Sequence, residues 1–209
     1  AETYEALLKI KEAVLRADTI VKNLLKFSRP SDLKRELLPP EEAVESALSN
    51  IPEKERARAE IQTSYEKGLF IEGDRNQLVQ VLINIISNAL QSIAAGVRGR
   101  LVIKTYKSGP DAGMDRICII EVRDNGVGIH KDNMPRLFEP FFTTKVYDKT
   151  IASKGMAGLG LISKAGEAVQ GTGLGLSVSK AIMNRHKGDI QVDSVEGSGT
   201  VVYLKLPLS

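Results

Sequence analysis

Asp124-Asn125-Gly126-Val127-Gly128-Ile129 follows directly on an apolar run that predicts a β-strand over residues 116–123. An acidic side chain at a strand end, followed by two glycines, is typical of a turn where the backbone approaches a ligand closely. The Asp124 carboxylate could accept a hydrogen bond from an exocyclic amine at such a turn. A plain Asp-Asn-Gly turn would have the same sequence, so this motif decides nothing by itself.

The most apolar helix that the sequence predicts lies upstream, beginning at Asp74 and continuing to about Ala95. Asn84 and Asn88 are four residues apart, so both amides project from one face of this helix. A neutral amide oxygen suits a hard cation such as Mg²⁺, which also binds phosphate oxygens. Two buried amides that satisfy neighbouring backbone groups are an equal alternative.

Downstream, Gly171-Thr172-Gly173-Leu174-Gly175-Leu176 leads into a helix predicted over residues 174–185. Glycines at a helix start expose backbone N–H groups, and the helix dipole favours an anion at that end. The spacing matches neither the Walker P-loop nor the dinucleotide-binding fingerprint. Gly197-Ser198-Gly199-Thr200 then predicts a hairpin turn between two final strands, over residues 189–194 and 200–206.

Several further elements complete the predicted fold. A helix opens at Pro40, with acidic residues in its first turn, and is predicted to run to about Ala57. A loop-rich region is predicted over residues 124–172. Short strands are predicted at residues 37–38, 60–65, 69–71 and 100–108. Together these elements predict an α+β fold in which helices cover one face of a sheet.

The order of the motifs is specific, although each motif alone is weak. The asparagine helix, Asp-x-Gly-x-Gly, Leu137-Phe138-Glu139-Pro140-Phe141-Phe142, Gly-Thr-Gly-Leu-Gly-Leu and Gly-Ser-Gly-Thr follow one another along the chain. In that order they resemble the N, G1, F, G2 and G3 boxes of the histidine kinase ATP-binding domain. That family belongs to the GHKL superfamily, with the Hsp90 and MutL ATPases. The resemblance covers about residues 33–207 and implies a mixed sheet.

The resemblance implies ATP and Mg²⁺ as ligands and gives roles to particular residues. Asn88 matches the Mg²⁺-binding asparagine, and Asn84 matches the other N-box position, near the phosphates. Asp124 matches the acid that recognises the adenine amino group. The other ATP-binding positions that it implies are Gly126, Gly128, Lys145, Gly171, Thr172, Gly173, Leu174, Gly175, Leu176 and Thr200. The phenylalanines that would anchor the ATP lid on apolar surface are Phe138, Phe141 and Phe142.

One position separates a kinase from a hydrolase. In the Hsp90 and MutL relatives, a glutamate that activates water stands four residues before the metal-binding asparagine. Here Asn84 occupies that position, and an amide cannot take up a proton at neutral pH. The resemblance therefore implies a protein histidine kinase that transfers the γ-phosphate of ATP to a histidine. A GHKL-type ATPase and a non-catalytic nucleotide-binding interaction module are the alternatives.

Residues 1–30 are predicted to form one long helix before an ATP-binding domain of residues 31–209. Apolar side chains recur in this helix at spacings of three and four, which is the pattern of a helical bundle. The segment resembles the second helix of the family's dimerization and phosphotransfer hairpin, and the first helix is missing. We expect the chain either to self-associate through residues 7–28 or to show that helix poorly ordered.

The phosphoacceptor histidine is expected to be absent from this chain. The family carries it in a His-Glu or His-Asp sequence on the first helix of the hairpin. The two histidines here, His130 and His186, lie elsewhere, and we expect structural or surface roles for both. The partners that the resemblance implies are a histidine-bearing hairpin and a response regulator receiver domain. It also implies a homodimer for the longer parent protein.

The ATP lid is predicted over about residues 139–172, which is long for the family. Within it, Gly158–Ala165 nearly copies Gly173–Ala181. The first copy is either a local duplication in a mobile loop or a second helix start that competes for the phosphate. We assign function to the later copy, because the expected helix and strands follow it. Gln91 and Ser92 stand where the family often has a basic residue and an aromatic, so fewer phosphate contacts are expected.

The composition of the 209 residues is ordinary for a globular protein, with 42% hydrophobic residues, 26% charged residues and a net charge of +3. The basic residues are dispersed and tryptophan is lacking, so no nucleic-acid partner is expected. Cys118 is the single cysteine, and we expect it to be buried. No apolar stretch approaches the ~20 residues that span a bilayer, and no signal peptide is recognisable. A cytoplasmic location is therefore expected, with a membrane-anchored parent left open.

Overall fold

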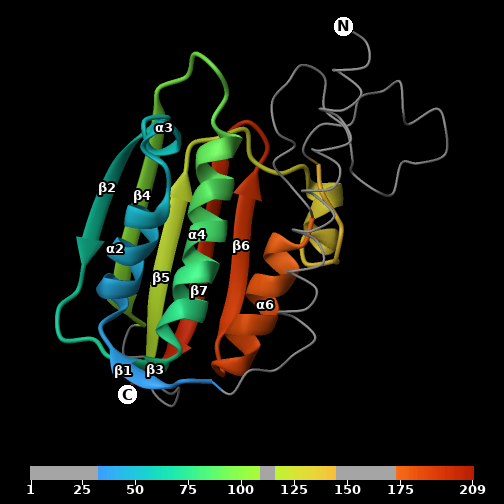
Figure 1. Ribbon diagram of the computed structural model, residues 1–209. Helices are drawn as coiled ribbons and strands as arrows, with labels where there is room; N and C mark the ends of the chain where they lie inside the picture. The colour runs from blue at the N-terminus through green and yellow to red at the C-terminus, as the bar shows by residue number, and fades with distance from the viewer. Residues whose placement is uncertain (1–32, 109–115, 145–172) are drawn as a thin grey trace, which may run out of the picture.

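The computed structural model describes residues 33–108, 116–144 and 173–209. In these ranges a five-stranded sheet carries the three longer helices on one face, as Figure 1 shows. Across the sheet, the strands follow in the order β2 (Ala59–Tyr65), β4 (Gly99–Lys107), β5 (Ile117–Asp124), β7 (Gly199–Pro207) and β6 (Asp189–Val195). The helices over it are α2 (Pro40–Asn50), α4 (Arg75–Ser92) and α6 (Gly175–Arg185).

The sheet is mixed, as the resemblance implied. β2 runs parallel to β4, and the other three pairings are antiparallel. Buried and more exposed residues alternate along β4 and β7, because successive side chains point to opposite faces of a sheet. The buried positions of the sheet are mostly apolar and include Leu101 and Ile103 of β4, Ile120 and Val122 of β5, and Leu204 of β7. The predicted α+β fold, with helices on one face of a mixed sheet, is confirmed.

α4 lies at the centre of the helical layer, between α2 and α6 (Figure 1). It begins where the sequence predicted, because the Asp74 side chain caps it by accepting a hydrogen bond from Gln77 N at 3.1 Å. Its apolar residues recur at helical spacing and face the sheet and the other helices. The buried ones are Leu78, Val81, Leu82, Ile85, Ile86, Ala89 and Leu90.

The helix that opens at Pro40 ends earlier than predicted. The sequence predicted a helix to about Ala57, but α2 stops at Asn50. Pro52 disfavours helical geometry in the residue before it, and Ile51 is accordingly extended, with φ −85° and ψ 129°. A short separate helix, α3 (Glu53–Arg56), follows the proline.

α4 also ends early, at Ser92 instead of Ala95. Ile93 is extended, with φ −73° and ψ 121°, and the Ser92 carbonyl oxygen accepts a hydrogen bond from Val127 N at 3.0 Å. The helix ends here because the Ser92 carbonyl oxygen accepts its hydrogen bond from the turn after Asp124 and not from a following turn of the helix.

Two smaller elements differ from the prediction. The strand predicted at residues 69–71 is β3 (Ile71–Gly73), because only these residues pair with β1 (Glu36–Leu38) in an antiparallel register. A short 3-10 helix, η1 (Lys131–Arg136), interrupts the region predicted as loop. His130 caps this helix, since its Nδ1 accepts from Asp132 N at 3.2 Å.

Some predicted features lie outside the described residues. These are the long helix within residues 1–30, the lid from residue 145 to residue 172, and the near copy Gly158–Ala165. Cys118 is described and is buried, which raises the pKa of its thiol to about 12. No helix in the described part of the chain combines the length and apolar character needed to cross a membrane.

His186 joins the C-terminal end of α6 to the start of α4. Its ring is buried, with Nε2 accepting from Asp74 N at 2.9 Å and Nδ1 lying 2.8 Å from Ile182 O. Because a backbone N–H donates to Nε2, the proton of the neutral ring is on Nδ1 and is donated to the Ile182 carbonyl. Burial lowers the pKa of His186, which favours this neutral form.

We expect His186 to make the free energy of unfolding fall as the pH is lowered from about 7 to about 5.5. The unfolded chain protonates this histidine near pH ~6.5, whereas the pKa of the folded residue is lower. The unfolded state therefore takes up more protons in this interval, which favours unfolding. Urea unfolding at several pH values should show that the free energy of unfolding of His186→Gln depends less steeply on pH than that of the wild type. Parallel curves for wild type and His186→Gln would contradict this role.

Candidate functional site

Asp124 is the last residue of β5, and only 7% of its surface is exposed. Its Oδ1 accepts hydrogen bonds from Gly126 N at 2.8 Å, Ser92 Oγ at 3.2 Å and Thr200 N at 3.3 Å. These are all the hydrogen bonds that the described residues donate to this carboxylate, so Oδ2 is left as an acceptor for a ligand. Burial raises the pKa of Asp124, and the three hydrogen bonds oppose that shift.

The two glycines of the turn after Asp124 are packed tightly against other segments. A Cβ on Gly126 would overlap with Ser92 Oγ, and a Cβ on Gly128 would overlap with the carbonyl oxygen of Val195. Gly128 also has a φ of 68°, a left-handed conformation that residues with a side chain rarely adopt. Both close approaches are to groups of the protein itself, and the approach of this backbone to a ligand stays a prediction.

Asn84 and Asn88 lie half-buried on α4, one turn apart. Asn84 Nδ2 donates to Ser179 Oγ of α6 at 3.0 Å, and Ser179 is buried. A Cβ on Gly175 would overlap with Asn84 Oδ1, so the first residue of α6 lies directly against this side chain. The structure thus brings the asparagine helix and the second glycine motif together.

The N-terminus of α6 begins beside Asn84 without a side-chain cap. Gly173 has a φ of 67° and packs against the backbone of Phe141, and Leu174 at the N-cap position is buried. The first N–H groups of a helix have no partner within the helix, and the helix dipole favours negative charge there. This end of α6 therefore suits an anionic group of a ligand that also reaches α4.

Thr200 connects the last hairpin to the Asp124 turn. Beyond the bond from its N–H to Asp124, its Oγ1 lies 2.9 Å from Ser194 Oγ. Ser194 Oγ also accepts from Ile129 N at 2.9 Å and donates to Gly199 O at 2.9 Å. One hydroxyl therefore holds the glycine turn, the hairpin and the end of β6 in a fixed arrangement.

Residues 73–209 match the sequence family described as "Histidine kinase-, DNA gyrase B-, and HSP90-like ATPase". The chain belongs to this family. The matched region starts next to the N-cap of α4 and includes every site residue described above. The resemblance inferred from the order of the motifs is confirmed.

Relatives within the histidine kinase-like ATPase family are named as kinases. Signal transduction histidine-protein kinase AtoS of Escherichia coli (strain K12) is 33% identical over 192 residues, which are 91% of this chain and 27% of AtoS. Sensor histidine kinase ZraS of Salmonella typhi is 30% identical over 210 residues, which are 99% of this chain and 38% of ZraS. The chain therefore spans well under half the length of either relative.

A solved structure confirms the fold of this family member. Full-length ShkA in complex with AMPPNP matches with a TM-score of 0.71 at 20% identity, covering 100% of this chain and 39% of ShkA. Together, the family and its named members identify the chain as the ATP-binding catalytic core of a sensor histidine kinase. Three predicted ATP-binding residues of this core, Lys145, Gly171 and Thr172, lie outside the described residues.

Two of the three phenylalanines predicted to anchor the lid of the kinase core make ring contacts. Lys180 Nζ lies 5.5 Å from the ring centroid of Phe138, which also packs against the hydrophobic core. The guanidinium carbon of Arg136 lies 4.5 Å from the ring centroid of Phe142. Phe141 is 47% exposed. Phe138 therefore attaches its segment to α6 and to the core, whereas the contact of Phe142 is local. Anchoring of the lid by these rings stays a prediction.

Sequence reasoning missed three serines that hold the site of the kinase core together: Ser92, Ser179 and Ser194. Ser92 stood out only as a departure from the family pattern. Ser179 lies within Gly173–Ala181 and Ser194 at the end of a predicted strand, but neither was given a role. Their partners in the site are 32, 95 and 65 residues away along the chain. No local pattern predicts hydrogen bonds over such separations.

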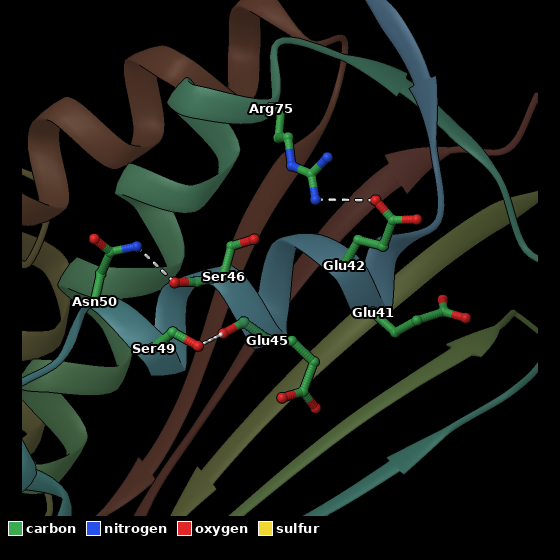
Figure 2. Close-up of a pocket in the computed structure, with 7 residues that line it drawn as sticks. All are labelled: Glu41, Glu42, Glu45, Ser46, Ser49, Asn50 and Arg75. Atoms are coloured by element: carbon green, nitrogen blue, oxygen red, sulfur yellow. Dashed lines mark hydrogen bonds and ion pairs between the residues drawn. The ribbon is translucent and has the colours of Figure 1, made fainter.

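A shallow groove of about 450 Å³ on α2 contains none of the predicted site residues (Figure 2). Arg75 at the start of α4 pairs with Glu42 at 2.9 Å, and Ser49 Oγ donates to Glu45 O at 2.9 Å. The lining residues are Glu41, Glu42, Glu45, Ser46, Ser49, Asn50 and Arg75. The excess of carboxylates makes the groove unsuited to a polyphosphate.

Replacing Gly128 with alanine should destabilise the kinase core more than the same change at Gly197. Both glycines have positive φ, 68° and 77°, and left-handed geometry costs an L-residue about 1–2 kcal/mol. Only at Gly128 would the new Cβ also overlap a backbone oxygen, which adds about 1–3 kcal/mol of overpacking. At Gly197 nothing lies within 4 Å. Urea unfolding of both variants measures the difference, and equal losses would show that the turn packs more loosely than described.

Proposed function

We propose that this chain binds Mg²⁺-ATP between α4, the turn after Asp124 and the start of α6, and presents the γ-phosphate to a histidine side chain. The observation that carries this proposal is the arrangement of Asp124, whose Oδ1 takes all three hydrogen bonds donated by the described residues. Its Oδ2 is then the acceptor for the exocyclic amine of adenine. Gly126, Gly128 and Thr200 would shape the space around the base.

Asn84 favours phosphate transfer over hydrolysis. An amide cannot take up a proton at neutral pH, and the Nδ2 of this one donates to Ser179 Oγ at 3.0 Å. A water molecule beside Asn84 would find no base there, so ATP would stay intact until another nucleophile reaches the γ-phosphate. Positioning and charge compensation would then supply most of the catalysis.

Asn88 is the proposed Mg²⁺ ligand. It lies half-buried on the same face of α4 as Asn84, one turn further towards Ser92. A neutral amide oxygen fits a hard cation that keeps several waters and shares phosphate oxygens with the nucleotide. Bound there, Mg²⁺ would offset the negative charge of the phosphates while Asn88 holds one side of its coordination sphere.

The start of α6 is the proposed phosphate contact. Gly173 and Gly175 bring the backbone close to Phe141 and to Asn84, and the helix dipole favours negative charge at this end. We extend the proposal to the neighbouring positions that the family pattern implies, which are Lys145, Gly171, Thr172, Leu174 and Leu176.

The acceptor histidine is proposed to lie on a histidine-bearing hairpin outside this chain. His186 cannot serve as the nucleophile, because it is 2% exposed and both of its ring nitrogens are hydrogen-bonded. His130 uses Nδ1 to cap η1. We further propose that residues 1–30 form the second helix of such a hairpin in a homodimeric, cytoplasmic kinase. A response regulator receiver domain would receive the phosphoryl group.

Replacing Asp124 with asparagine should weaken ATP binding about tenfold or more, because a hydrogen bond to a charged group is lost and an amide donor faces the adenine amine. The substitution is isosteric, so the domain should stay folded. Isothermal titration calorimetry with Mg²⁺-ATP measures the effect. Asp193→Asn, an exposed change on β6, is the matched control and should bind as the wild type does. Wild-type affinity in Asp124→Asn would count against the adenine assignment.

Supplying a histidine-bearing hairpin with γ-labelled Mg²⁺-ATP should move the label to an acid-labile phosphohistidine on the hairpin. The bond from the γ-phosphorus to the bridging oxygen breaks, ADP leaves, and a bond from phosphorus to the imidazole nitrogen forms. Without the hairpin, phosphate release should be slow because Asn84 provides no base. Asn88→Ala should lose the transfer. Rapid phosphate release without an acceptor would favour a stand-alone ATPase, and undetectable ATP binding would favour a non-catalytic interaction module.

A further inference from the structure

Ser92, the last residue of α4, contacts three segments at once. Its Oγ donates to Ala89 O at 2.7 Å and lies 3.2 Å from Asp124 Oδ1. Its carbonyl oxygen accepts from Val127 N at 3.0 Å. The end of α4, the end of β5 and the glycine turn therefore meet at this one residue.

Ser92 also fills the space that Gly126 leaves open. A Cβ on Gly126 would overlap with Ser92 Oγ and would lie 2.7 Å from Ser92 Cβ. Gly126 N donates to Asp124 Oδ1 at 2.8 Å, so the glycine and the serine hydroxyl approach the same carboxylate oxygen. The two residues interlock around Oδ1 and fix the orientation of the carboxylate.

The Ser92 hydroxyl has one proton and two acceptors, Ala89 O and Asp124 Oδ1. A hydrogen bond to an ionised carboxylate is roughly twice as strong as a neutral one, so ionised Asp124 attracts this proton. Burial raises the pKa of Asp124, and Ser92 is among the donors that oppose this shift. Ser92 therefore favours the ionised carboxylate, whose Oδ2 can only accept a hydrogen bond.

We propose that Ser92 is a positioning residue that gives the nucleotide site its preference for an exocyclic amine on the base. This inference rests on the proposed function, because Asp124 must face the base. An ionised Asp124 accepts from the amine of adenine and repels the carbonyl that hypoxanthine carries at the same place. A protonated Asp124 could donate to that carbonyl, and the preference for the amine would be lost.

The test compares Mg²⁺-ATP with Mg²⁺-inosine triphosphate, whose base carries a carbonyl in place of the amine. Calorimetry on the whole chain between pH of about 5.5 and about 8 gives both Kd values. Ser92→Ala should weaken ATP binding about tenfold and inosine triphosphate binding by less than about twofold. The pH at which ATP binding is lost on the acid side should rise. Ser92→Thr, which restores a hydroxyl, should recover the preference for ATP.

Ser49→Ala is the matched control. Ser49 also lies in the last turn of a helix and donates to a carbonyl of that helix, Glu45 O at 2.9 Å, but it belongs to the groove on α2 (Figure 2). Its loss should leave both Kd values unchanged. In an Asp124→Asn background, Ser92→Ala should change the Kd of ATP by less than about twofold, because the group that it positions is no longer charged.

An unchanged ratio of the two Kd values in the folded Ser92→Ala variant would overturn the inference, whether both nucleotides bind more weakly by the same factor or as in the wild type. Ser92 would then have a role only at the helix end. A further tenfold loss of ATP affinity (about 1.4 kcal/mol) on adding Ser92→Ala to Asp124→Asn would also overturn it. Failure of the wild-type chain to bind ATP would instead refute the proposed function, and the role of Ser92 with it.

Discussion

Burial of α4 between the sheet, α2 and α6 is the constraint on which the rest of the structure depends. Seven of its residues are buried, and burying a Leu or Ile side chain contributes about 1.5–3 kcal/mol. The same helix carries Asn84 and Asn88 and ends at Ser92, so apolar packing sets the positions of the polar groups. A displacement of α4 along the sheet would move the asparagines and the serine beside Asp124 together.

Features that depend on near neighbours in the sequence were predicted well. The helix start at Asp74, the strand before Asp124 and the glycine turn after it each follow from residues a few positions apart, and each forms close to its predicted bounds. The helix predicted through Pro52 was wrong although its signal was local, because the restriction on Ile51 outweighed a helical pattern that resumes beyond it. η1 was missed because its cap is His130, which is not among the usual capping residues.

Which side chains meet across the fold could not be predicted. Ser92 lies 32 residues from Asp124, and Asn84 lies 95 residues from Ser179, so these hydrogen bonds depend on how α4 and α6 are placed on the sheet. The family pattern gave the two asparagines and the aspartate their positions along the chain. It did not indicate which oxygen of the Asp124 carboxylate accepts hydrogen bonds from the protein itself. Under the proposed function, the other oxygen is the one that accepts from a ligand.

The buried charge of Asp124 has a consequence for the domain as a whole. Its pKa is raised in the folded chain, so the ionised form is held less well there than in the unfolded chain. Above the folded pKa, this ionisation subtracts from the free energy of unfolding. Under the proposed function, a neutral residue here would make the domain more stable but would remove the charged acceptor for the amine of the base. The amine of a bound nucleotide would supply the missing hydrogen-bond donor, and binding to the folded state alone raises its stability. Under the proposed function, the concentration of nucleotide would thus affect the stability of the folded domain as well as its activity.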